Sequence, residues 1–214
     1  MDQLPPFLLL DFMQLTDRSF PTGSFVHSNG LEWLVKNSKA GLESVIRIRL
    51  DQQLARFELA FLFAAIAGSP NPLDERYHAM LMPREAREAS VQVGRQFLSN
   101  ARDLFPELHD MALLPHGHHP IAFGVVARAL DVPPRIAALT YAFQTVRGQI
   151  SAGQRLTRLG QVEAQRLMHR LKPSIETAVD AAIDLPLEDA IPFAPLLDIA
   201  SMAHERSEVR LFVS

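Results

Sequence analysis

The stretch Leu42–Ala67, LESVIRIRLDQQLARFELAFLFAAIA, indicates most directly which class of fold the chain adopts. Its large apolar residues recur three and four positions apart, as on one face of an α-helix. They are Leu42, Val45, Ile46, Leu50, Leu54, Phe57 and Phe61. The alternation over residues 46–50 would also suit a short strand, but it is a small part of a much longer helical pattern. The stretch therefore predicts one long helix, ended by GSPNP at residues 68–72.

Helical spacing continues along most of the chain, and proline or glycine separates the segments. Helices are predicted at residues 84–105, 121–130, 164–182 and 194–204. Another helix is expected to begin at Pro133 and Pro134, because the N–H groups of a first turn have no partner within the helix. No segment has the pattern of a strand. The sequence predicts an all-α fold, a single-domain bundle of about eight to ten helices.

Composition excludes several classes of partner and chemistry. The 214 residues carry 21 lysines and arginines against 24 aspartates and glutamates, so we expect neither nucleic acid nor an anionic membrane as a partner. The lack of cysteine excludes disulfides, thiolate catalysis, iron–sulfur clusters and cysteine zinc sites. The first residues do not have the pattern of a secretory signal, since Asp11 interrupts their apolar run. Residues 59–68 cover about half of the roughly 20 residues that a membrane helix needs. These features predict a soluble, cytoplasmic protein.

The sequence HGHH places His116, His118 and His119 in a loop bounded by two prolines. Neutral imidazoles bind nickel, zinc and copper, and a tight turn can bring several of them together. The competing interpretation is a solvated loop with adventitious metal affinity. A specific metal site normally needs about four ligands that are held by further hydrogen bonds.

No motif predicts catalysis. GQISAGQR at residues 148–155 has the glycine spacing of a phosphate-binding loop, but glutamine and arginine stand where lysine and serine or threonine are required. It more simply indicates a helix whose glycines let another segment approach closely. His204, Glu205 and Glu208 suggest half of an acid–base or metal cluster, yet the second histidine of the HExxH pattern is missing. A solvated helix end is the simpler interpretation, and we expect no enzymatic activity.

The closing residues, SMAHERSEVRLFVS at 201–214, raise a question of packing. Leu211 and Phe212 are large and apolar, whereas chain ends are normally polar and frayed. Such residues need a destination. It is either the protein's own core or a partner.

Three segments carry spaced motifs. LTDRSFPTGSFVHSNGLE, residues 15–32, presents Asp17, Phe20, Pro21, Gly23, Phe25, His27, Ser28, Gly30, Leu31 and Glu32. AGQRLTRLGQ, residues 152–161, presents Arg155, Leu156, Leu159, Gly160 and Gln161. The closing segment presents Ser201, His204, Glu205, Arg210, Leu211, Phe212 and Ser214. Together the motifs resemble the UreF family of urease accessory proteins over essentially the whole chain. Thr157, Val209 and Val213 depart from the family pattern, and Val213 stands where that family frequently has arginine.

The resemblance implies an all-α cytoplasmic homodimer without catalytic activity or cofactor. Residues 1–200 would form the all-α domain and residues 201–214 a tail that binds a partner. The implied partners are the accessory protein UreD, also called UreH, the GTPase UreG, and apo-urease, into which the complex inserts nickel. The expected partner-binding residues are Pro21, Gly23, Phe25, His27, Ser28, Gly30, Glu32, Arg155, Gly160, Gln161, His204, Glu205, Arg210, Leu211, Phe212 and Ser214.

The resemblance suggests where the apolar side chains of the tail pack. We expect Leu211 and Phe212 to fill an apolar pocket of the UreD-type partner, with Arg210 and His204 making polar contacts around it.

The resemblance also implies modulation of GTP hydrolysis by UreG. Arg155 or Arg158 could act there as an arginine finger, although a role at helix ends is favoured. Glu32, His27 and Glu205 could line an internal polar passage for nickel, but buried polar residues are more often satisfied structural groups.

Two alternatives to the adaptor stay open. One is a nickel-binding metallochaperone that uses the histidine loop. The other is a helical enzyme that depends on His204 and Glu205.

Overall fold

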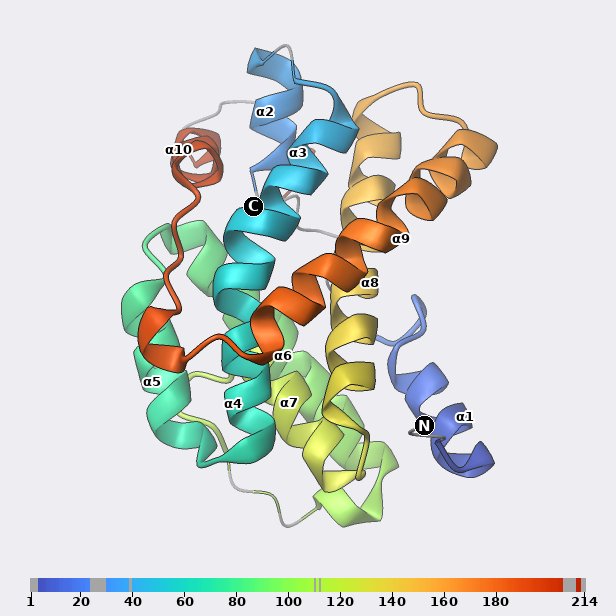
Figure 1. The fold of residues 1–214 in the computed structure, drawn as a ribbon, viewed down its shortest axis with the longest axis vertical. Coiled ribbons are helices and arrows are strands. Elements are labelled where there is room, and N and C mark those ends of the chain that lie inside the picture. The colour runs from blue at the N-terminus through green and yellow to red at the C-terminus, as the bar shows by residue number, and fades with distance from the viewer. Residues whose placement is uncertain are drawn as a thin grey trace.

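The computed structural model describes residues 4–23, 30–38, 40–109, 111, 113–205 and 211–212. These residues form α-helices joined by short connections (Figure 1). The helices are α1 (Pro6–Leu15), α2 (Leu31–Asn37), α3 (Leu42–Arg49), α4 (Leu59–Ala67), α5 (Pro70–Met80), α6 (Arg84–Leu104), α7 (His119–Ala129), α8 (Pro134–Leu156), α9 (Gln161–Ile183) and α10 (Pro195–His204). Two short 3₁₀ turns lie at Pro106–Leu108 and Leu187–Asp189. The described part of the chain has no strand, so the predicted all-α class is confirmed.

The long helix predicted at residues 42–67 is confirmed, with one local change. Between α3 and α4 the chain forms a π-helix, Leu50–Glu58, so the three segments follow one another without a break. Leu50, Leu54 and Phe57 remain buried on its inner face. The spacing of apolar residues gave no sign of this change, because it is the spacing of an ordinary α-helix. π-Helices are rare in proteins, and a segment longer than a single turn is unusual.

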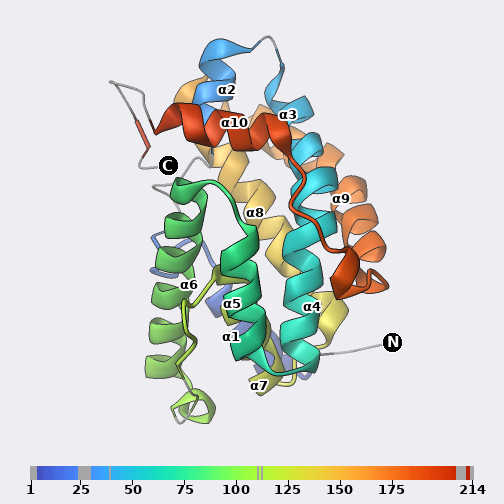
Figure 2. The same cartoon turned by 90° about the vertical axis from the view of Figure 1, so that its left-hand side faces the viewer.

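The core lies where α4, α7 and α8 meet. α4 contacts α7, α8 and α9, and α6 packs against the other side of α7. Aromatic rings fill the centre, with Phe57 stacked on Tyr77 at 4.6 Å between ring centroids and Phe97 stacked on Phe123 at 5.3 Å. α10 lies across one end of this bundle, over α2 and α6, as Figures 1 and 2 show from two sides.

Other helix boundaries follow the predictions closely. α6 ends at Leu104, and α8 has Pro134 in its first turn. α9 continues through Pro173, and α10 ends at His204, where the last predicted helix ends. α7 begins at His119, earlier than predicted, so the last histidine of HGHH belongs to a helix.

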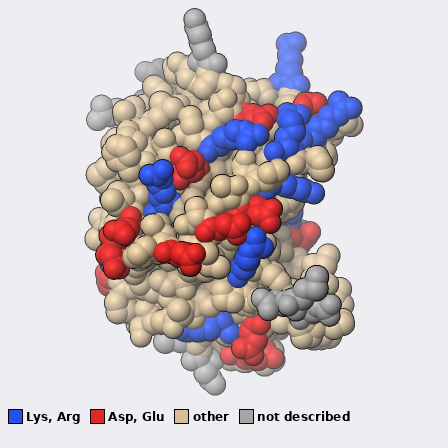
Figure 3. All heavy atoms as spheres, in the orientation of Figure 1, with Lys and Arg blue, Asp and Glu red and all other residues tan. Residues whose placement is uncertain are grey.

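Charged side chains of both signs lie on the surface. On the face shown in Figure 3, basic and acidic side chains alternate over short distances, so this face has no field of a single sign. Several of these charges are paired, as in Arg170 with Glu43 and Arg135 with Asp180, at 3.1 and 2.9 Å. Among the described helices, none combines the length and the apolar character that crossing a membrane requires.

Candidate functional site

A buried cluster of three ionisable side chains joins α2, α6 and α10. The ring of His204 lies between two carboxylates, with Nε2 3.1 Å from Glu32 and Nδ1 3.1 Å from Glu85. The exposed fractions of His204, Glu32 and Glu85 are 1%, 1% and 8%. The expectation that His204 belongs to a solvated helix end is therefore wrong.

The end of the chain binds to the same carboxylate. Glu32 accepts hydrogen bonds from the backbone N–H groups of Leu211, at 3.0 Å, and Phe212, at 3.2 Å. Lys36 Nζ lies 2.6 Å from Oε1 of Glu32, the oxygen that also accepts from Leu211. Burial opposes ionisation of Glu32, but the hydrogen bonds from Lys36, the two backbone groups and His204 outweigh it and lower its pKa from 4.5 to about 2.

The side chain of Phe212 lies in a pocket of its own chain. It is 4% exposed and packs in a cluster with Leu31, Leu34, Val45, Ala152, Ala194, Leu197 and Ala200. The guanidinium of Arg155 lies 4.5 Å from the centre of the Phe212 ring, within the range of a cation–π contact. Leu211, in contrast, is 66% exposed. Both residues were expected in a pocket of a partner, whereas the structure places Phe212 in the protein's own core.

Local backbone geometry brings the first and last motifs together. Gly30 precedes α2 with φ of 80°, a conformation that favours glycine. A Cβ atom at Gly30 would lie 3.0 Å from the backbone nitrogen of Ser201 and 3.2 Å from the Cβ of Ala200. Glycine at this position therefore allows the start of α2 to lie against α10, which places Glu32 beside His204.

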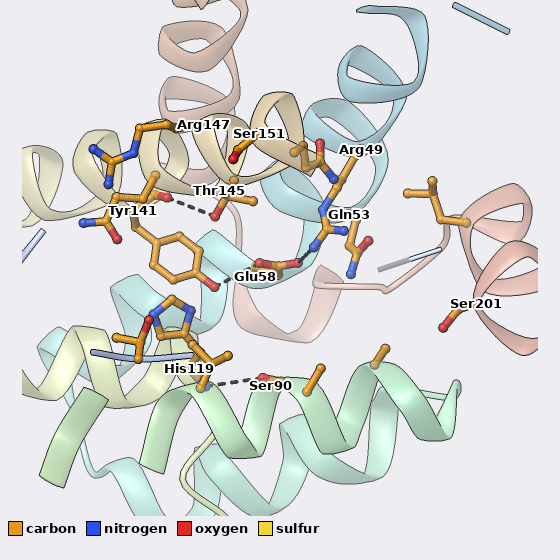
Figure 4. Close-up of a pocket in the computed structure, with 18 of the residues that line it drawn as sticks. Arg49, Gln53, Glu58, Ser90, His119, Tyr141, Thr145, Arg147, Ser151 and Ser201 are labelled. Atoms are coloured by element: carbon orange, nitrogen blue, oxygen red, sulfur yellow. Dashed lines mark hydrogen bonds and ion pairs between the residues drawn. The ribbon is translucent and has the colours of Figure 1, made fainter. Parts of the chain in front are cut away.

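A second polar feature is a cavity of about 400 Å³ between the π-helix, α6, α8 and α10 (Figure 4). Glu58 is at its centre, 3.5 Å from Arg49, and accepts a hydrogen bond of 3.0 Å from Tyr141 Oη. Burial, together with the negative charge of Glu58, raises the pKa of Tyr141 well above its ordinary value. With its amide oxygen turned toward Arg49, Gln149 accepts two hydrogen bonds of 3.1 Å from that guanidinium.

Some of the polar side chains that line the cavity make no hydrogen bond to the rest of the described chain. Within the described residues, Gln144 Nε2 and Ser201 Oγ are buried without a hydrogen-bond partner, and both residues line the cavity. Burial lowers the pKa of His119, which also lines it, to about 4, so its ring is neutral at neutral pH. Glu32 and Glu205, which were expected to line a polar passage, are not among the lining residues.

The histidine loop is a packed structure, not a solvated one. Asp74 is fully buried and accepts hydrogen bonds from the backbone N–H groups of His116, Gly117 and His118, at 2.6, 2.7 and 2.9 Å. The imidazole of His118, also fully buried, lies 3.0 Å from Ser90 Oγ. The solvated-loop interpretation is therefore wrong.

The imidazoles of the loop have further partners. His78 Nδ1 lies 3.1 Å from His118 Nε2, and the ring of His78 stacks on that of His116 at 3.7 Å. His116 Nε2 lies 2.9 Å from Glu75. Over the residues that the structure describes, no group of three or more histidine, aspartate or glutamate side chains is arranged to hold a metal ion.

The remaining predicted residues are spread over three places. Pro21 accepts a hydrogen bond of 2.7 Å from Asn100, and Gly23 has φ of 73°. Gly160 precedes α9, whose first residue, Gln161, lies 3.2 Å from Gln154. Glu205 follows α10, 3.7 Å from Arg84. Phe25, His27, Ser28, Glu208, Val209, Arg210, Val213 and Ser214 lie outside the described residues.

Several buried polar partners come from distant segments and were not predicted from the sequence. Glu85, Asp74 and the Arg49–Glu58 pair were not singled out, although each is buried. Glu85 lies in the first turn of α6, where a glutamate is ordinary, so no local pattern marks it. Arg49 and Glu58 did offer a signal, because charged residues on a strongly apolar helix face need partners.

Comparison with known proteins gives a consistent result. A family model described as UreF matches residues 36–172. A urease accessory protein UreF from Paenarthrobacter aurescens (strain TC1) is 34% identical over 219 residues, covering 96% of this chain and 97% of the relative. One from Arthrobacter sp. (strain FB24) is 35% identical over 217 residues, covering 96% of each chain. One from Bacillus sp. (strain TB-90) is 31% identical, covering 96% of this chain and 99% of the relative.

Proposed function

The chain belongs to the UreF family of urease accessory proteins, and on that premise we propose that it is a non-enzymatic adaptor for urease maturation. In this proposal it binds a UreD/UreH-type protein and the GTPase UreG as a homodimer in the cytoplasm. The assembly delivers nickel to apo-urease. The chain supplies surfaces and positions its partners, and no cofactor of its own is needed.

One observation carries the proposal: residues of three distant motifs meet at one end of the bundle. Glu32 of the first motif binds His204 of the third and the backbone of Phe212. Arg155 of the second motif lies over the ring of Phe212. His204 and Phe212 are buried. These side chains therefore do not surround an open cleft of the kind in which an enzyme binds its substrate. Buried contacts between the three motifs fix the shape of the surface at this end of the bundle. An adaptor needs such a fixed surface to bind its partners.

Exposed apolar residues at this end support a partner surface. α10 presents Leu196, Ile199 and Met202, spaced three residues apart and 40%, 53% and 45% exposed. Leu211 adds another exposed apolar side chain near the same end, because its backbone N–H binds Glu32 of α2. We assign this end to the UreD-type partner. A comparable row on α1, formed by Phe7, Leu10 and Met13, is the candidate surface for the homodimer.

The chemistry of nickel favours transfer inside a closed assembly. Nickel binds strongly to nitrogen ligands of many proteins, so a free ion would be lost to adventitious sites. A protein in this role needs a route of weak polar contacts and no tight site of its own. The cavity around Glu58 offers such groups, including the neutral ring of His119 and the hydroxyl of Ser201. We place the internal polar passage there, and not at Glu32 and Glu205.

The proposal also includes an effect of this chain on the rate of GTP hydrolysis by UreG. Arg155 packs on Phe212, which favours a structural role. Arg158 follows α8 and is exposed, so it is the better candidate for an arginine finger. If Arg158 is an arginine finger, Arg158→Lys should lower the rate of GTP hydrolysis by UreG in the complex at least about tenfold. Lysine cannot replace the planar guanidinium in that role.

The alternative is a metallochaperone that binds nickel through the histidine loop. The grouping of His78, His116 and His118 favours it, since their rings are in contact. Their hydrogen bonds to Glu75 and Ser90 count against it. Tight nickel binding at one ion per chain, lost when His116, His118 and His119 are replaced by alanine, would favour the alternative.

Capture of a purified UreD-type partner tests the adaptor. We expect Leu211→Ser and Ile199→Ser to weaken capture at least about tenfold, since exposed apolar anchors carry much of the energy of an interface. Leu104→Ser is the matched control, because Leu104 is 49% exposed at the C-terminal end of α6, whereas the opposite end of that helix carries Glu85 against His204. Circular dichroism should show unchanged helicity in all three variants. If both test variants retain capture and urease activation, this end of the bundle does not bind the partner.

A further inference from the structure

Three histidines from two distant segments are in contact where the histidine loop meets α5. The ring of His78, on α5, stacks on that of His116 at 3.7 Å between centroids, and its Nδ1 atom lies 3.1 Å from Nε2 of His118. His118 Nδ1 lies 3.0 Å from Ser90 Oγ. His116 Nε2 lies 2.9 Å from Glu75. Both ring nitrogens of His118 are thus engaged by other side chains, and the described residues form no metal-binding group here. The chemistry left to the cluster is the binding of protons.

The contact between His78 and His118 limits how many protons the cluster can hold. A hydrogen bond between two imidazole nitrogens needs one N–H group and one lone pair. When both rings are doubly protonated, the two facing nitrogens each carry a hydrogen, so the bond is lost and two positive charges lie close together. A charge on His116, whose ring stacks on that of His78, adds to this repulsion. The packed cluster therefore holds fewer protons than the same three rings would hold in solvent.

The other ionisable groups around the cluster do not remove this restriction. They are Asp74, Glu75 and Tyr77 from α5 and Arg87 and Arg95 from α6. The two carboxylates favour protonation of the rings, and Arg87 opposes it. Tyr77 is uncharged, because burial raises its pKa well above the ordinary value. Burial has the largest effect on the rings: it lowers the pKa of His78 and brings that of His118 to about 4.

We propose that His78, His116 and His118 form a proton-sensitive latch that holds the histidine loop against α5 and α6. With neutral rings the latch is closed. Proton uptake opens it, so the loop detaches while the helices stay folded. Opening breaks the three backbone hydrogen bonds that Asp74 accepts from the loop. The latch does not depend on the proposed function.

Opening of the latch also loosens one wall of the cavity around Glu58. Ser90 Oγ contacts the ring of His118 and accepts a hydrogen bond of 3.3 Å from the backbone N–H of His119. Ser90 and His119 both line the cavity, as Figure 4 shows. Detachment of the loop therefore removes contacts that fix this wall.

Acid favours the open latch, because the open form binds protons more readily. A lowered histidine pKa stabilises the closed form above the pKa of the open form, and this stabilisation is lost as the pH falls toward the lowered value. For His118 the two values are 6.5 and about 4. The equilibrium constant for opening should therefore be about twentyfold larger at pH 5 than at pH 7 from this histidine alone.

Hydrogen exchange of the full-length chain at pH 7 and pH 5 tests the latch. After correction for intrinsic exchange rates, the protection of the amides of His116, Gly117 and His118 should fall about twentyfold, because these amides lose Asp74 as their acceptor. At both pH values they should be less protected than the amides in the middle of α7, since the loop opens without unfolding of the whole chain. Equal protection of the loop and α7 overturns the proposal, as does a change in loop protection of less than about twofold.

Single variants identify the titrating group. His118→Gln cannot take up a proton, so the fall in loop protection between pH 7 and pH 5 should disappear. His78→Gln should make the fall smaller, because its amide oxygen can turn toward a protonated His118, and this variant decides the question if His118→Gln does not fold. His119→Gln is the matched control and should keep the fall, since the ring of His119 packs on Phe97 and Tyr141, outside the cluster. A full fall in His118→Gln or His78→Gln, or its loss in His119→Gln, overturns the proposal.

Discussion

Glu32 makes a pH-dependent contribution to stability that can be calculated from its surroundings. Its pKa is about 2 in the folded chain against 4.5 in the absence of those contacts. A depressed carboxyl pKa stabilises the fold above the unfolded pKa, and this stabilisation is lost as the pH falls through the folded pKa. The difference of about 2.5 pH units corresponds to about 3 kcal/mol, at 1.36 kcal/mol for each unit. We therefore expect the loss to begin near pH 4.5 and to continue to about pH 2.

Urea unfolding of the wild-type chain and of Glu32→Gln between pH 7 and pH 3 measures this term. Glutamine keeps the shape of the side chain but does not titrate, so the variant should be less stable at pH 7 and its deficit should shrink as the pH falls. Glu88→Gln is the control, because Glu88 forms an exposed pair with Arg84 and should follow the wild-type profile. Parallel profiles for the wild type and Glu32→Gln would refute the assignment of an ionised, multiply hydrogen-bonded Glu32.

Three further predictions concern packing and a second pH range. Phe212→Ala should lower the free energy of unfolding by about 3 kcal/mol, the low end for a buried phenylalanine, while Leu211→Ala stays within about 0.5 kcal/mol of the wild type in urea unfolding. The lowered pKa of His119, about 4 against 6.5, means that the unfolded chain binds the proton first, so stability should fall by up to roughly 3 kcal/mol from pH 6.5 to pH 4. His119→Gln should flatten that part of the profile, and an unchanged slope would contradict the burial of the neutral ring. Gly94→Ala should destabilise the chain by about 3 kcal/mol or more, because its Cβ would overlap the carbonyl oxygen of Gly117 in the histidine loop. Gly148→Ala, which meets nothing within 4 Å, should instead raise the thermal midpoint slightly through helix propensity.

The helices were predictable because their signal is local. The apolar spacing from Leu42 to Phe61 and the prolines at 133 and 134 mark elements whose boundaries the structure confirms. The π-helix was not predictable, since the spacing of Leu50, Leu54 and Phe57 is that of an ordinary α-helix and all three are buried in the structure.

The polar sites depend on residues far apart in the sequence, which no spacing rule connects. His204 was expected to be solvated because its own segment is highly charged, and its burial requires Glu85 and Glu32 from two other helices. The histidine loop is ordered by Asp74, which no neighbouring residue marks as a loop-binding carboxylate. Glu32 was identified from the resemblance alone, whereas His204 and Arg155 also belonged to segments that were compared with catalytic motifs. Their convergence at Phe212 became visible only in three dimensions.

The hydrogen bonds that Glu32 accepts from the backbone have a consequence for sequence variation at the end of the chain. Because Glu32 binds the N–H group of residue 211 and not its side chain, any residue except proline can keep that hydrogen bond. Position 212 has no such freedom, since its side chain is enclosed by apolar residues of the same chain. Neighbouring positions are thus constrained by different physical requirements, one by a backbone donor and the other by the volume of a side chain.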